Sequence, residues 1–109
     1  MFQISLRMMA RPNRSMEAVE ALRSIRVASR MDRGFIAGRI YQEVDNPDAL
    51  CFEQDWSSEP ELKSHIRSNC FTDLLMLMET SPEVPVLEIH SIRDVFGINY
   101  IEAVRYSDS

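Results

Sequence analysis

The fold is decided by residues 41–71, which read YQEVDNPDALCFEQDWSSEPELKSHIRSNCF. The run DNPD at residues 45–48 has strong turn chemistry and separates two strand-like segments, residues 35–44 and 50–56. Because the connection is short, we expect the two strands to form an antiparallel hairpin. Ser58 then begins a capping-box sequence, which predicts a helix directly after the hairpin.

The rest of the chain extends this pattern in both directions. Residues 2–9 alternate between apolar and polar side chains, as a half-buried strand does. The predicted order is strand 2–9, helix 14–31, strands 35–44 and 50–56, helices 59–68 and 69–78, and strands 84–93 and 98–106. With the two middle helices merged, this order predicts an α+β fold of the ferredoxin-like split βαβ type with an antiparallel sheet. We expect a single domain over residues 1–109, with a core of about residues 2–93 and a C-terminal extension, residues 97–106, that carries an extra strand.

Apolar residues occur on both faces of the later predicted strands. In one of them Phe35 and Tyr41 oppose Ile36 and Ile40. Helices on one side of the sheet cover only one of these faces. We therefore expect a homodimer in which the sheet of one chain packs on the sheet of a second copy.

Composition and charge exclude several classes of protein. A formal net charge of −5 argues against a general nucleic-acid binder. The longest apolar run, residues 74–78, is far shorter than the roughly 20 residues of a membrane-spanning helix. The N-terminus has no signal-peptide pattern, so we expect a cytoplasmic protein in which Cys51 and Cys70 are reduced thiols.

Three features of residues 41–71 resemble the antibiotic biosynthesis monooxygenase domain family. One strand runs into a Y-x-x-x-D-x-P-D turn at residues 41–48, the next strand ends in Trp56, and His65 follows nine residues later. The resemblance covers roughly residues 2–93. It implies a dimeric α+β barrel built from two ferredoxin-like chains. It also implies a monooxygenase that acts on quinols or polycyclic aromatic phenols without a cofactor.

Two positions depart from the pattern of that family. Gln54 stands where the family commonly has Glu, and Phe52 stands where polyketide-oxidising members have Asn. A related branch degrades haem with an Asn in the first strand, and residues 2–10 contain no Asn. These departures argue against haem degradation, and they also argue against the reaction of the polyketide-oxidising members.

His65 and Trp56 are the candidate catalytic residues. The imidazole group titrates near neutral pH, so His65 is suited to remove a phenolic proton. Trp56 could stack on an aromatic substrate. The alternative interpretation is that His65 is a packing histidine bonded to backbone and that Trp56 is an ordinary core residue.

Four more residues are candidates for substrate binding. Phe52 and Gln54 share a strand face with Trp56, and Phe71 lies in the following helix. Arg39 could stabilise a phenolate, or it could form an ion pair between subunits. No metal-ligand spacing and no glycine-rich phosphate loop occur, so we expect no metal and no cofactor.

Three functions remain open on the sequence alone. The first is a small cofactor-independent monooxygenase that uses oxygen and a small aromatic substrate. The second is a non-catalytic binding protein for a small aromatic ligand. The third is an isomerase or decarboxylase that acts on a ring, because one fold can host several reactions.

Overall fold

A computed structural model describes residues 1–107 of the chain. Four strands and four helices follow one another as β1 (Phe2–Met9), α1 (Ser15–Ser29), β2 (Phe35–Glu43), β3 (Asn46–Trp56), α2 (Glu59–Ile66), α3 (Asn69–Met78), β4 (Val86–Ser91) and α4 (Ile98–Arg105). The strands form one antiparallel sheet in the order β2-β3-β1-β4. This is the predicted ferredoxin-like α+β fold.

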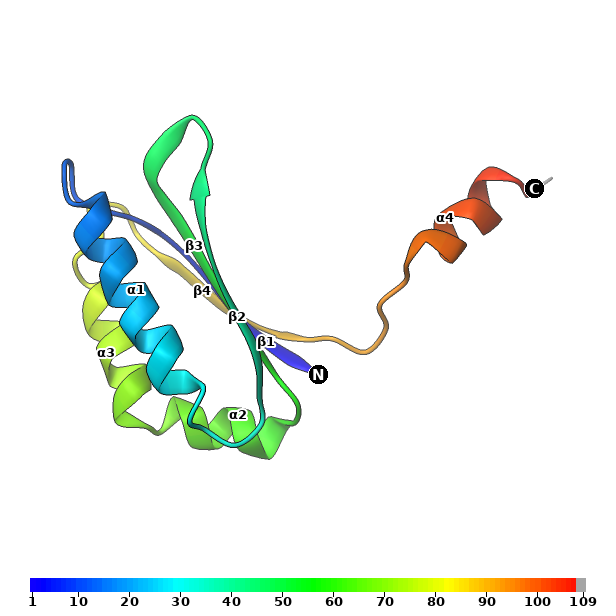
Figure 1. Ribbon diagram of the computed structural model, residues 1–109, viewed down its shortest axis with the longest axis horizontal. Helices are drawn as coiled ribbons and strands as arrows, with labels where there is room; N and C mark the ends of the chain where they lie inside the picture. The colour runs from blue at the N-terminus through cyan, green and yellow to red at the C-terminus, as the bar shows by residue number, and fades with distance from the viewer. Residues whose placement is uncertain (108–109) are drawn as a thin grey trace.

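Helices α1, α2 and α3 all lie on one face of the sheet, whereas the opposite face is left open (Figure 1). The period-two alternation of β1 and β3 determines which side chains point toward the helices. Ile4, Leu6, Phe52 and Trp56 are fully buried between the sheet and the helices. From α1, Leu22 packs into the same core.

A β-bulge in β2 changes the predicted distribution of apolar residues. Phe35 pairs with Trp56, and the register then shifts between Phe35 and Ala37. Because the bulge inserts Ile36, Phe35 and Ile40 lie on the same face, toward the helices, whereas the sequence prediction separated them. The open face is consequently more polar than the alternation of the sequence suggested.

The hairpin turn lies earlier than predicted. Val44 and Asp45 form the turn, Glu43 pairs with Asn46, and Pro47 already belongs to β3. Pro47 is tolerated there because the pairing of β2 and β3 is irregular next to the turn, so no ladder hydrogen bond depends on its missing N–H.

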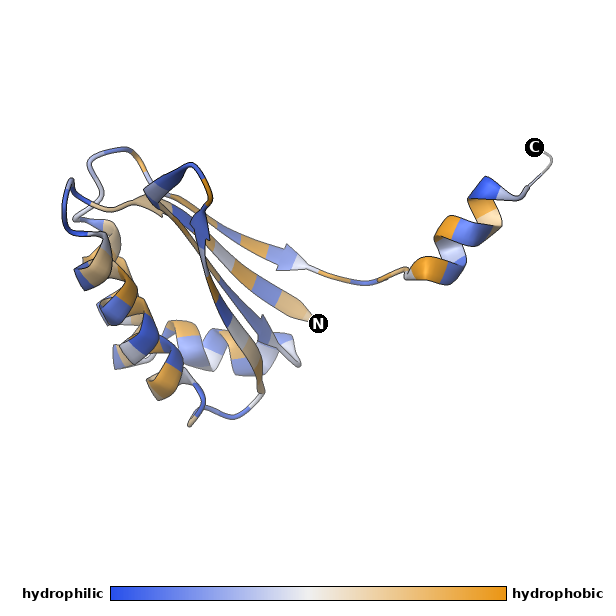
Figure 2. Cartoon of the chain, turned by 45° about the horizontal axis from the view of Figure 1, so that its top comes forward, coloured by the Kyte–Doolittle hydropathy of each residue, from blue (hydrophilic) through white to orange (hydrophobic). Residues whose placement is uncertain are grey.

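The prediction of an extra C-terminal strand over residues 98–106 is wrong. These residues form helix α4, on an arm that extends away from the body of the domain (Figure 1). β4 ends at Ser91, so a further strand would need a neighbour for its backbone groups, whereas a helix satisfies them internally. Figure 2 shows hydrophobic segments alternating with hydrophilic ones along α4. Its hydrophobic residues recur at helical spacing and are exposed: Ile98, Ile101 and Val104.

No helix within residues 1–107 is both long and apolar enough to cross a membrane.

Candidate active site

Strand β3 supplies three of the predicted site residues. Phe52, Gln54 and Trp56 alternate along the strand, so all three point toward the helices, and each is completely buried. Gln54 is uncharged, so its burial leaves no charge in the core. The end of β3 therefore places an amide and an indole side by side on the inner face of the sheet.

Helix α2 brings His65 onto the indole ring. The rings of His65 and Trp56 stack with a centroid distance of 4.3 Å and an interplanar angle of 28°. Phe71, from α3, meets His65 edge-on at 5.9 Å, and Phe35 meets Trp56 edge-on at 5.7 Å. These geometries are the favourable ones for aromatic pairs, so they hold His65 in a defined orientation. We call Gln54, Trp56, His65 and Phe71 the aromatic cluster.

One ring nitrogen of His65 contacts a carboxylate group. Nδ1 of His65 lies 2.7 Å from Oδ2 of Asp32, in the loop between α1 and β2. The side chain of His65 is 1% exposed and that of Asp32 is 35% exposed. The contact thus joins the partly exposed carboxylate of Asp32 to the buried imidazole of His65.

Gln54 is held by a short hydrogen-bonded chain. Its amide donates to Oγ of Ser29 over 2.7 Å, and the Ser29 hydroxyl donates to the carbonyl of Ile25. Cys70 lies 3.4 Å from the same hydroxyl. Burial raises the pKa of the Cys70 thiol, so the sulfur is a neutral member of this chain at neutral pH.

Three buried polar atoms of the aromatic cluster have no hydrogen-bond partner among residues 1–107. They are Oε1 of Gln54, Nε1 of Trp56 and Nε2 of His65. Unpaired buried polar atoms are uncommon because each one costs the free energy of its lost hydration. The cluster therefore offers one fixed acceptor, one fixed donor and an imidazole nitrogen to a partner that the chain itself does not supply.

A surface cavity of about 420 Å³ leads to the cluster. It is lined by residues of α2 and of the preceding loops, among them Asp32, Arg33, Glu61, Ser64 and His65. His65 is thus the member of the cluster at which solvent comes closest. A ring that is to stack on Trp56 must displace part of α2 or α3, because Trp56 and Gln54 are fully covered.

Arg39 does not belong to this cluster. It lies on the open face of the sheet, where it forms ion pairs with Asp55 at 2.9 Å and Glu53 at 3.8 Å. Burial raises the pKa of Asp55, but hydrogen bonds from Arg39 and Gln3 outweigh that effect, so the pKa lies below its usual value. The hydrogen bond to Asp55 also raises the pKa of Arg39. Since Asp55 must be ionised, the pair stabilises the fold above about pH 4, and that stabilisation is lost as the pH falls through the folded pKa.

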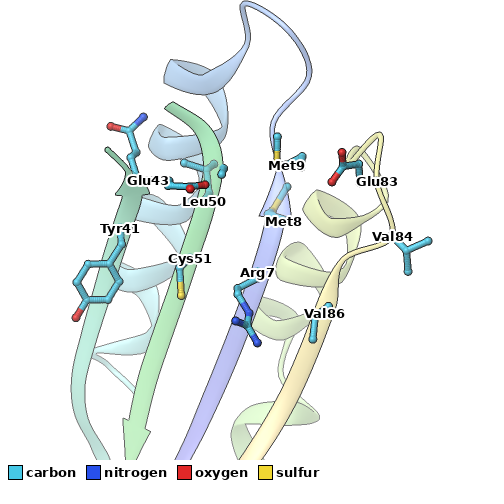
Figure 3. Close-up of a pocket in the computed structure, with 12 residues that line it drawn as sticks. Arg7, Met8, Met9, Tyr41, Glu43, Leu50, Cys51, Glu83, Val84 and Val86 are labelled. Carbon is cyan, nitrogen blue, oxygen red and sulfur yellow. The ribbon is translucent and has the colours of Figure 1, made fainter. Parts of the chain in front are cut away.

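The open face of the sheet carries a second, shallower hollow of about 380 Å³. Figure 3 shows Tyr41, Cys51, Arg7 and Val86, one side chain from each strand, on this face. Burial raises the pKa of the Cys51 thiol, so Cys51 is a weak nucleophile here. Both cysteines are free, as the sequence predicted.

Sequence reasoning missed two residues that hold the cluster, Asp32 and Ser29. Asp32 lies in a loop, where no periodicity indicates which way a side chain points. Ser29 lay within the helix predicted over residues 14–31, and its buried position could have been inferred from the spacing to Leu22 and Ile25. Within residues 1–107, no three His, Cys, Asp or Glu side chains are grouped as metal ligands.

Comparisons with known proteins agree with this architecture. The family model for antibiotic biosynthesis monooxygenases matches residues 1–74. The chain therefore belongs to the antibiotic biosynthesis monooxygenase family. No curated protein was found to match the sequence.

Solved structures show the same fold at low sequence identity. A conserved protein from Methanosarcina mazei is 24% identical, with 84% of this chain and 92% of that chain covered and a TM-score of 0.74. The protein Rv0793 from Mycobacterium tuberculosis is 16% identical, with 88% and 98% covered and a TM-score of 0.75. A structure named antibiotic biosynthesis monooxygenase is 13% identical, with 86% and 100% covered and a TM-score of 0.73.

Proposed function

We propose that this protein is a cofactor-independent monooxygenase that oxidises a quinol or another aromatic phenol with molecular oxygen at the aromatic cluster. The observation that carries the proposal is the set of three unpartnered polar atoms on Gln54, Trp56 and His65. Two of them are ring atoms of the stacked Trp56 and His65 side chains, so a partner that satisfies the set is best matched by an aromatic surface that carries polar groups. A hydroxylated aromatic ring has both.

The proposed roles follow from the chemistry of each side chain. His65 accepts the phenolic proton, which makes the ring electron-rich enough to react with oxygen. Trp56 donates its indole N–H to an oxygen atom of the substrate, and Gln54 accepts from a hydroxyl group. Phe52 and Phe71 form apolar walls that exclude water.

The overall reaction balances without a further reductant. A phenol with a free ring C–H takes up one oxygen molecule and gives a quinone and water. One oxygen atom forms the new carbonyl, and the other leaves as water with the phenolic hydrogen and the ring hydrogen. Four electrons pass from the substrate to oxygen, so the protein itself is neither oxidised nor reduced.

A second candidate function is a non-catalytic binding protein for a small aromatic ligand. Gln54 favours it, because an amide cannot act as the base that a glutamate at this position could be. The two functions share one site and differ only in whether oxygen is consumed.

Oxygen uptake separates the two candidates. We expect the protein, in buffer treated with a chelator, to consume oxygen with at least one member of a panel of hydroquinones and naphthols, in proportion to protein concentration. Binding of panel members with no oxygen uptake would favour the non-catalytic function and overturn the monooxygenase.

We also propose that the working form is a cytoplasmic homodimer in which the open sheet faces pack together as a dimeric α+β barrel. The hollow on that face and the exposed apolar residues of α4 support this assembly, as does the presence of two free thiols for a reducing compartment. Sedimentation at micromolar concentration should give twice the chain mass of 12.6 kDa. A stable species of one chain mass would contradict the dimer.

A further inference from the structure

We propose that Asp32 is the positioning residue that keeps the proton of neutral His65 on Nδ1 and so leaves Nε2 free to act as the base. This inference rests on the proposed function for its catalytic meaning, but the tautomer itself is a property of the resting protein. An ionised carboxylate can only accept hydrogen bonds, so the 2.7 Å contact requires a proton on Nδ1. In the neutral ring the lone pair then lies on Nε2, the atom with no partner among residues 1–107.

The backbone around Asp32 is fixed, so the carboxylate is in place before any ligand binds. The N–H of Asp32 donates to the carbonyl of Ser29 over 3.0 Å, and its carbonyl accepts from the N–H of Phe35 over 3.3 Å. Gly34 completes the turn with a φ of +89°, and the Glu61 side chain lies so close to it that there is no room for a Cβ atom. A turn that depends on glycine thus directs the Asp32 side chain toward His65.

Burial explains why such a carboxylate is needed. His65 is almost wholly buried, and a positive imidazolium ion is costly in that environment without a nearby negative charge. Asp32 supplies the charge from a partly exposed position at the edge of the cavity. Arg33 and Glu61 line the same cavity, and the Glu61 carboxylate accepts hydrogen bonds from Ser57 and Ser58.

The proton transfers of this arrangement balance. Nε2 of His65 takes the proton of the phenolic O–H, which leaves a phenolate and an imidazolium with a proton on each nitrogen. Asp32 stays ionised and stabilises the imidazolium. When the O–O bond of the oxygenated ring breaks, the ring carbon loses its hydrogen as a proton and becomes the new carbonyl. The departing oxygen takes up that proton and the proton returned by Nε2 and leaves as water, which restores the neutral Nδ1–H tautomer.

The test is the ¹⁵N spectrum of the histidine rings, recorded at alkaline pH without substrate. The chain has two histidines, so a His90→Gln variant assigns both sets of signals. We expect His65 to show a protonated Nδ1 and an unprotonated Nε2, and Asp32→Ala to transfer the proton to Nε2. Asp32→Leu, which is nearly isosteric and cannot accept a hydrogen bond, should do the same if the alanine variant does not fold. A wild-type His65 with its proton on Nε2, or with both nitrogens protonated at alkaline pH, would overturn the proposal.

Oxygen uptake supplies a second readout. With a phenol that the wild type oxidises, Asp32→Leu should lower kcat about 10- to 100-fold and leave KM within about twofold, since the proposed substrate contacts are intact. Glu59→Gln is the matched control, because it removes one negative charge from α2 at a residue that pairs with Lys63. Equal activity of Asp32→Leu and wild type would overturn the positioning role. Absence of oxygen uptake by the wild type would count against the proposed function alone, since the ring spectrum does not depend on it.

Discussion

Replacing His65 with glutamine should lower the rate of phenol-dependent oxygen uptake by about 10²- to 10⁴-fold, the usual contribution of a general base. Glutamine keeps a polar group of similar size in the core but cannot take up the phenolic proton. The rate loss should appear in kcat more than in KM, because the variant keeps the proposed substrate contacts of Trp56 and Gln54. Oxygen consumption with the best substrate of the panel measures both constants.

His90→Gln is the matched control for that experiment. His90 lies on the open face of the sheet, about half exposed, with Glu88 as its nearest partner. We expect its variant to retain the wild-type rate. If His65→Gln keeps its fold by circular dichroism and also keeps the wild-type rate, His65 is not the base.

Replacing Trp56 with alanine should lower the free energy of unfolding by about 3–5 kcal/mol, as large-to-small changes of buried aromatic residues do. Trp56 is fully buried, and it holds both His65 and Phe35 by ring contacts. The change leaves a cavity where the indole was and removes the surface on which His65 stacks. Urea unfolding followed by circular dichroism measures the loss, since the variant has no tryptophan fluorescence.

Tyr106→Ala provides the comparison for this loss of stability. Tyr106 is a large aromatic residue that is 77% exposed on the arm of α4. We expect its removal to change the free energy of unfolding by no more than about 0.5 kcal/mol. A Trp56→Ala variant that is as stable as Tyr106→Ala would show that Trp56 is not a packing centre of the fold.

The sequence predicted the parts of the cluster that obey a periodic rule. Phe52, Gln54 and Trp56 alternate along one strand, and an error of one residue in register would have placed all three on the wrong face. Phe71 belongs to a helix whose apolar residues recur at a period near 3.6. These regularities are local, so a single sequence is enough to recognise them.

Residues outside such regular patterns could not be placed in the same way. Arg39 was a candidate for the site, but the register pairs it with Glu53 on the open face. Asp32 lies in a loop, where the turn at Gly34 and backbone hydrogen bonds with Ser29 and Phe35 determine its direction. The prediction of a strand over residues 98–106 failed because its Ile, Tyr and Val residues favour strands. Within residues 1–107 no strand lies beside this segment to pair with it.

The most direct test of the aromatic cluster as the ligand site uses the indole N–H of Trp56. The chain contains one tryptophan, so its ¹H–¹⁵N spectrum has one indole signal, and that signal reports on an unpartnered donor inside the cluster. We expect anaerobic titration with a hydroquinone or naphthol that supports oxygen uptake to move this signal saturably downfield, as it gains a hydrogen bond. A substrate that is turned over but leaves the indole signal unmoved at saturation would contradict the site.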